Sequence, residues 1–136
     1  MGKRIKKVGL FMNTDIKVLI VDDYNTMLRI IRNLLSQIGF KNVDEAIDGT
    51  QALEKFKANN YGLIISDWNM EPMSGYEFLK EVRAGSHNNK VPFIMVTAES
   101  KTENVIKAKQ AGVSNYIVKP FNAETLKGKI ESVLQE

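Results

Sequence analysis

The sequence contains no cysteine, and none of its apolar runs approaches the roughly 20 residues that a membrane-spanning helix needs. The lack of cysteine excludes disulfide bonds and thiolate metal sites, and it fits a protein of a reducing compartment. The N-terminus is basic but has no apolar stretch of the kind found in secretory signal peptides. We therefore expect a cytoplasmic protein without a membrane segment.

Repeats, low-complexity segments and linkers are also missing from the 136 residues, so a single domain is expected. Four basic residues lie in the first seven positions, and no acidic residue precedes Asp15. The rest of the chain has 15 basic and 16 acidic residues, so the net charge of +3 comes from the N-terminal tail. A nucleic-acid-binding domain would carry its basic patch on the folded surface, and we expect no such partner. We interpret residues 1–14 as a basic, flexible extension and residues 15–136 as the domain. The alternative is a tail that contacts an anionic membrane or a partner.

Apolar patterns typical of strands and helices alternate along the rest of the chain. Short apolar runs predict five strands, at 17–21, 43–47, 62–66, 92–97 and 114–118. Apolar residues at three- and four-residue spacing predict helices around 27–38, 52–56, 78–82, 101–110 and 126–134. This alternation predicts an α/β fold of the (βα)₅ type, with a doubly wound parallel five-stranded sheet and helices on both faces.

Polar residues follow the ends of the predicted strands. Asp22 and Asp23 follow the first strand, Asp67 the third, Thr97 ends the fourth, and Lys119 follows the fifth. In the strand order 2-1-3-4-5 the first and third strands are neighbours, so the three aspartates would converge at the carboxyl edge. Crowded carboxylates repel each other unless a cation cancels their charge, and Mg²⁺ suits oxygen ligands and phosphate. With a hydroxyl and an ammonium nearby, this set meets the needs of phosphoryl transfer.

The order and spacing of four motifs resemble the response-regulator receiver family over about residues 15–134, and within it the stand-alone chemotaxis members. The motifs are VDD at 21–23, SDWNM at 66–70, MVTAE at 95–99 and YIVKPF at 116–121. The strand order 2-1-3-4-5, shared with flavodoxin-like folds, is the known order of this family. The resemblance implies a single-domain response regulator of a two-component phosphorelay, which modifies itself and is not an enzyme acting on a separate substrate.

The resemblance also implies a phosphorylation site. Asp67 would accept a phosphoryl group from the phosphohistidine of a histidine kinase. Mg²⁺ would be held by Asp23, Asp67 and the backbone carbonyl of Asn69, with Asp22 acting mainly through water.

Further residues around this site have implied roles. Lys119, aimed by a cis bond to the following proline, would pair with the phosphoryl group, and Thr97 would donate a hydrogen bond to it. Tyr116 would change rotamer as the space behind Thr97 empties. Asn69 and Glu99 would flank the path of the hydrolytic water and so tune the lifetime of the phosphate.

The implied output is the face formed by the fourth helix, the fifth strand and the fifth helix, because no output domain is expected after residue 134. Implied partners are a CheA-like histidine kinase, a FliM-like flagellar switch protein and, as a further candidate, a phosphatase. A monomer is expected.

One alternative function is that of a phosphate sink or kinase adaptor outside the motor. A haloacid-dehalogenase-type phosphatase would need a second aspartate where Asn69 stands, and a nucleotide binder would need a glycine-rich loop after the first strand.

One position departs from the family pattern. The family usually has proline four residues after the acceptor aspartate, whereas Glu71 stands there and Pro72 follows. We expect the extra charge of Glu71 to alter cation affinity or recognition by a kinase or phosphatase. The alternative is that Glu71 is a solvent-facing loop residue without such a role.

Overall fold

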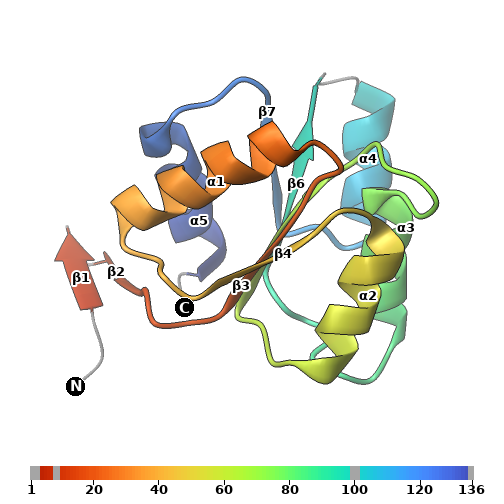
Figure 1. Ribbon diagram of the computed structural model, residues 1–136, viewed down its shortest axis with the longest axis horizontal. Coiled ribbons are helices and arrows are strands. Elements are labelled where there is room, and N and C mark those ends of the chain that lie inside the picture. Colours follow the sequence, from red (N-terminus) through yellow and green to blue (C-terminus); the bar gives the residue numbers. More distant parts are fainter. Residues whose placement is uncertain (1–3, 8–9, 99–101, 135–136) are drawn as a thin grey trace.

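The structure, a computed structural model, describes residues 4–7, 10–98 and 102–134 and contains the predicted parallel sheet (Figure 1). Its strands lie in the order β4-β3-β5-β6-β7, which is 2-1-3-4-5 when the five are counted along the chain. The strands are β3 (Val18–Val21), β4 (Val43–Ala46), β5 (Leu63–Asp67), β6 (Phe93–Thr97) and β7 (Asn115–Val118). This order confirms the doubly wound (βα)₅ fold.

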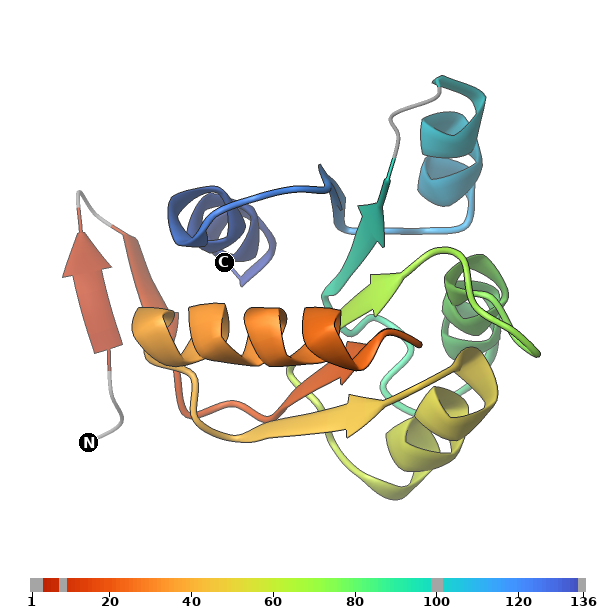
Figure 2. The same cartoon turned by 45° about the horizontal axis from the view of Figure 1, so that its top comes forward.

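Helices cover both faces of the sheet, as Figure 2 shows. One face carries α1 (Asn25–Ile38) and α5 (Ala123–Leu134), and the other carries α2 (Gly49–Ala58), α3 (Gly75–Ala84) and α4 (Thr102–Gln110). All five predicted helices are therefore present. Among the described residues, no helix has the length and apolar character to cross a membrane.

The central strands supply apolar residues to both faces of the sheet. In β3, Val18 and Ile20 belong to the apolar cluster under α1 and α5, whereas Leu19 and Val21 belong to the cluster under α2 and α3. Such two-sided burial explains why β3 and β5 are almost continuously apolar, because alternate side chains of a strand point to opposite faces.

Two further strands, β1 (Arg4–Lys7) and β2 (Leu10–Asn13), form an antiparallel pair that the sequence did not lead us to expect. The pair stands outside the main sheet (Figure 1), and β2 contacts α5. Met12 and Thr14 are buried, and Met12 belongs to the cluster under α1 and α5. Packing against the domain thus begins before residue 15, while the flexibility of residues 1–14 stays a prediction.

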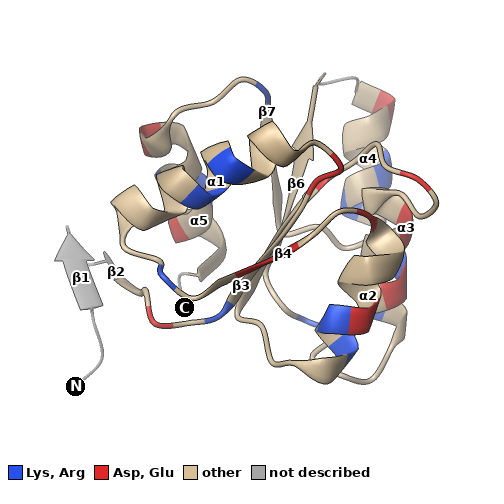
Figure 3. Ribbon diagram, viewed as in Figure 1, with Lys and Arg blue, Asp and Glu red and all other residues tan. Residues whose placement is uncertain are grey.

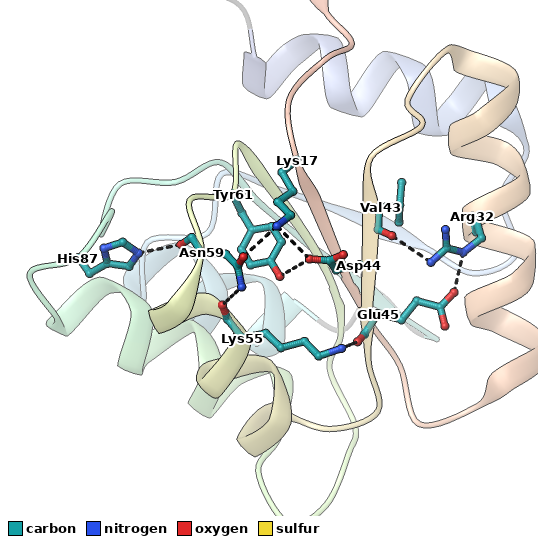
Figure 4. Close-up of polar contacts among 9 residues, drawn as sticks. All are labelled: Lys17, Arg32, Val43, Asp44, Glu45, Lys55, Asn59, Tyr61 and His87. Atoms are coloured by element: carbon teal, nitrogen blue, oxygen red, sulfur yellow. Dashed lines mark hydrogen bonds and ion pairs between the residues drawn. The ribbon is translucent and has the colours of Figure 1, made fainter.

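The edge strand β4 is capped by two basic side chains, drawn in Figure 4. In the five-stranded sheet β4 pairs with β3 alone, and the carbonyls of Val43 and Glu45 point away from that neighbour. Arg32 of α1 donates a hydrogen bond to Val43 O at 3.0 Å, and Lys55 of α2 donates one to Glu45 O. Capped carbonyls of this kind oppose the addition of another strand at an open edge.

Candidate functional site

Three aspartates gather where β3 and β5 lie side by side. The two strands are in register, with Val21 opposite Ser66, so Asp22 and Asp23 follow β3 next to Asp67 at the end of β5. Each aspartate offers one carboxylate oxygen, and these atoms all lie within 4.8 Å of one another. Figure 3 shows acidic residues at this carboxyl edge of the sheet. The structure thus brings together the three acids as predicted.

Burial disfavours the charged form of two of these acids. Asp22 and Asp67 are buried, whereas Asp23 is exposed. Burial raises the pKa of Asp22, although a hydrogen bond from the Tyr24 N–H and the positive charge of Lys119 oppose the rise. Burial also raises the pKa of Asp67, and the neighbouring charge of Asp22 raises it further. The site therefore holds negative charge that a bound cation would stabilise.

Lys119 contacts both buried acids. Its Nζ lies 3.1 Å from Asp67 Oδ1 and 3.4 Å from Asp22 Oδ2. Burial acts to lower the pKa of Lys119, but the attraction of Asp67 and Asp22 outweighs it, so the pKa of this lysine lies above its ordinary value. The peptide bond from Lys119 to Pro120 is cis, as the family resemblance implied. The ammonium group of Lys119 cannot neutralise all three carboxylates. The remaining negative charge could be neutralised by a divalent cation.

A hollow of about 400 Å³ opens beside the acids. It is lined by Asp23, Trp68, Asn69, Met70, Glu71 and Ser74. This volume exceeds that of several water molecules, so the hollow has room for a hydrated cation or a small phosphoryl donor. The structure places Asn69 and the unusual Glu71 at the wall of the same hollow as Asp23.

Thr97 and Tyr116 lie behind the acids, on the next two strands. Thr97 ends β6, directly beside β5, and is buried. Tyr116 of β7 is half-buried and lines a narrow pocket together with Thr97. The structure thus brings the two predicted switch residues together. Glu99, predicted to tune the phosphate lifetime, lies outside the described residues.

Sequence reasoning did not identify the role of Gly75. This residue begins α3, and its N–H donates a hydrogen bond to Trp68 O at 2.8 Å. A Cβ atom at this position would lie 1.9 Å from the carbonyl oxygen of Asp67, so only glycine fits against the backbone of Asp67. The sequence signal at this point was the preceding Ser74, which forms a capping box with Glu77 and so marks the start of the helix.

Comparisons with known proteins agree with this geometry. The family model of the response regulator receiver domain matches residues 18–131. Chemotaxis protein CheY-3 of Vibrio cholerae is 47% identical over 124 residues, which are 91% of this chain and 95% of that protein. Chemotaxis protein CheY of Pseudomonas aeruginosa is 50% identical over 119 residues, or 88% of this chain and 96% of the relative.

Solved structures give the same result. The chemotaxis response regulator CheY4 of Vibrio cholerae has a TM-score of 0.82 at 38% identity, covering 88% of this chain and 99% of its own. The receiver domain of a sensor histidine kinase from Pseudomonas aeruginosa has a TM-score of 0.80 at 27% identity, covering 88% and 98%. That structure holds a magnesium ion in its active-site cleft. This chain is therefore a CheY-like member of the response-regulator receiver family.

Proposed function

We propose that this protein is a single-domain response regulator that accepts a phosphoryl group from a histidine kinase on Asp67. The observation that carries the proposal is the position of Asp67, 3.1 Å from the ammonium of Lys119 and within 4.8 Å of carboxylate oxygens of Asp22 and Asp23. A nucleophilic carboxylate, oxygen ligands for a cation and a positive charge for the phosphoryl oxygens therefore occupy one place.

Mg²⁺ fits the residues around Asp67. Asp22, Asp23 and Asp67 supply hard oxygen ligands in excess of the positive charge of Lys119, and the adjoining hollow has room for the waters that Mg²⁺ retains. The backbone carbonyl of Asn69 would be a further ligand. When bound, the ion would neutralise negative charge that develops on the phosphoryl oxygens.

The transfer forms one bond and breaks one. A carboxylate oxygen of Asp67 attacks the phosphorus of the kinase phosphohistidine, and the P–N bond breaks with its electron pair returning to the imidazole, which takes a proton from water. Lys119 stabilises the charge on the phosphoryl oxygens, and the hydroxyl of Thr97 donates a hydrogen bond to one of them. Later attack by water releases inorganic phosphate and restores Asp67, at a rate tuned by Asn69 and Glu99. The protein thus modifies only itself.

The signal would leave through the face formed by α4, β7 and α5. Tyr116 shares its pocket with Thr97, so a shift of Thr97 toward the phosphoryl group would leave space for the tyrosine ring. Two arrangements of this face would then differ in affinity for a partner. Because the similar proteins are named for chemotaxis, we propose a CheA-like kinase as donor and a FliM-like flagellar switch protein as target. A phosphatase is a further candidate partner of this monomeric, cytoplasmic regulator.

Phosphotransfer from a labelled chemotaxis kinase tests the proposed acceptor. We expect label on the wild type and on Asp44→Asn, a control aspartate on the edge strand β4, and none on Asp67→Asn. Full labelling of Asp67→Asn would contradict the assignment.

A binding experiment tests the proposed output. We expect a flagellar switch peptide to bind the protein at least several-fold more tightly after treatment with acyl phosphate. Unchanged binding would favour a phosphate sink or kinase adaptor.

A further inference from the structure

Trp68, the single tryptophan of the chain, separates the two pockets of the site. It lines the hollow beside Asp23 and also the narrow pocket that Thr97 and Tyr116 share. The indole is therefore a common wall between the place where a phosphoryl donor would arrive and the residues that would respond to it.

Tyr76 holds this indole from the first turn of α3. The ring planes of Trp68 and Tyr76 are 4° apart and their centroids 5.3 Å apart, which is a stacked arrangement. One turn further along the helix, Lys80 places its Nζ 4.6 Å from the centroid of the Tyr76 ring, within the range of an attractive cation–π contact. An indole, a phenol and an ammonium thus form a continuous series beside the acceptor.

The surroundings of Trp68 fix its backbone and close one side of its ring, whereas the hollow of about 400 Å³ leaves room on the other side. The backbone of Trp68 is fixed at both groups, since its N–H donates to Val96 O at 3.0 Å and its carbonyl accepts from Gly75 at 2.8 Å. The pocket behind Thr97 has only about 10 Å³ of free space, which holds at most one water and cannot receive an aromatic ring. The contact with Tyr76 therefore decides whether the indole keeps one position.

We propose that Tyr76 is a positioning residue for the phosphoryl-acceptor site, which acts by stacking on Trp68. The proposal rests on the proposed function of Asp67. Without the tyrosine ring, the indole of Trp68 would sample further rotamers, expose more of its surface to water and intrude on the hollow. The geometry that admits a donor to Asp67 would then exist for a smaller fraction of the time, and small misplacements at a reacting centre lower rates strongly.

Two variants separate the aromatic ring from the hydroxyl. Tyr76→Leu removes the stack, whereas Tyr76→Phe keeps it and serves as the matched control. For Tyr76→Leu we expect quenching of Trp68 fluorescence by acrylamide to rise about twofold, and the rate of Mg²⁺-dependent labelling of Asp67 by a small acyl phosphate to fall about three- to tenfold. Both quantities should stay at the wild-type level in Tyr76→Phe.

Three results would overturn the proposal. The first is wild-type quenching and labelling in Tyr76→Leu with wild-type stability. The second is the same quenching and labelling with a lower urea midpoint, which would make Tyr76 merely structural. The third is raised quenching together with slowed labelling in Tyr76→Phe. Quenching needs no phosphoryl donor, so it tests the stack by itself. Failure of the proposed function would instead appear as full labelling of Asp67→Asn.

Discussion

The three aspartates at the carboxyl edge of the sheet differ in burial. Asp22 is 1% exposed and Asp67 is 8% exposed, whereas Asp23 faces solvent. Burial raises the pKa of both Asp22 and Asp67, so the folded protein disfavours the charged form of each carboxyl group. Without a cation, the site therefore costs the protein part of its stability, as is common where function requires strained or uncompensated groups.

Removing one of these buried charges should stabilise the metal-free protein. A carboxyl group whose pKa is raised on folding contributes stability below its unfolded pKa, near 3.8, and loses it as pH rises through the raised folded pKa. We expect Asp22→Asn, which keeps an acceptor for the Tyr24 N–H, to raise the free energy of unfolding by about 1 kcal/mol at pH 7, and by less near pH 4. Urea unfolding of the wild type and Asp22→Asn in the presence of a chelator, at pH 7 and near pH 4, measures the two differences in free energy of unfolding. An equal increase at the two pH values would contradict this explanation.

The negative charge of Glu71 should strengthen Mg²⁺ binding by long-range electrostatic attraction, without direct contact with the ion. Glu71 is exposed, but it lines the same hollow as Asp23. Exposed charges at such range have modest effects, so we expect Glu71→Gln to weaken Mg²⁺ binding about twofold at low ionic strength and by less in high salt. A Mg²⁺ titration followed by Trp68 fluorescence measures this, with Glu54→Gln on α2 as control. An unchanged midpoint would make Glu71 an ordinary loop residue.

At the scale of elements, the loop between β5 and α3 is fastened at both ends. Gly75 packs directly against the carbonyl of Asp67, and Gly49 at the start of α2 donates a hydrogen bond to Met73 O at 3.0 Å. A Cβ atom on Gly49 would lie 2.7 Å from that same oxygen. Both helices thus approach the loop after β5 at distances that only glycine allows, and they fix the backbone that carries Asp67.

Two glycine-to-alanine changes should therefore have opposite effects. Alanine at 75 would force the carbonyl of Asp67 to move, so we expect Gly75→Ala to lower the free energy of unfolding by about 1–3 kcal/mol and to slow labelling of Asp67. Gly128 lies in α5, where nothing described lies within 4 Å of an added Cβ. Gly128→Ala should raise stability by about 0.5–1 kcal/mol. Urea unfolding compares the two, and a Gly75→Ala protein with wild-type stability and labelling would refute the packing argument.

The caps on β4 should keep this edge from pairing with a second chain. In a double variant with Arg32→Met and Lys55→Met, the carbonyls of Val43 and Glu45 lose their donors, and we expect self-association that rises with concentration. The control is Arg29→Met with Lys57→Met, which removes the same charges from exposed positions of the same helices. Sedimentation measures the association. If both double variants sediment alike, the caps do not govern association.

At the scale of the whole molecule, the sequence predicted those features that depend on local patterns, such as the burial of a strand on both of its faces. The central strands β3, β5 and β6 are buried throughout, so their apolar runs could be recognised without the structure. The order of acids, hydroxyl and lysine at the strand ends predicted which residues the structure brings together. The packing of Gly75 against Asp67 and the stack of Trp68 on Tyr76 could not be predicted. Both depend on the angle at which α3 meets the sheet, which the packing of the whole domain sets.

The pairing of β1 with β2 also escaped prediction. Residues 4–7 are rich in basic side chains, a composition that does not favour a strand, and the burial of Met12 depends on its contact with the cluster under α1 and α5. Tertiary contact outweighed local preference here.

The central claim is that Asp67 is the reversible phosphoryl acceptor and that the surrounding aspartates hold the Mg²⁺ it needs. Intact-mass spectrometry after treatment with a small acyl phosphate tests it most directly. We predict one phosphoryl group per chain on the wild type with Mg²⁺, and none on Asp67→Asn or on the wild type with a chelator. One phosphoryl group on Asp67→Asn, or full modification without Mg²⁺, would contradict the account.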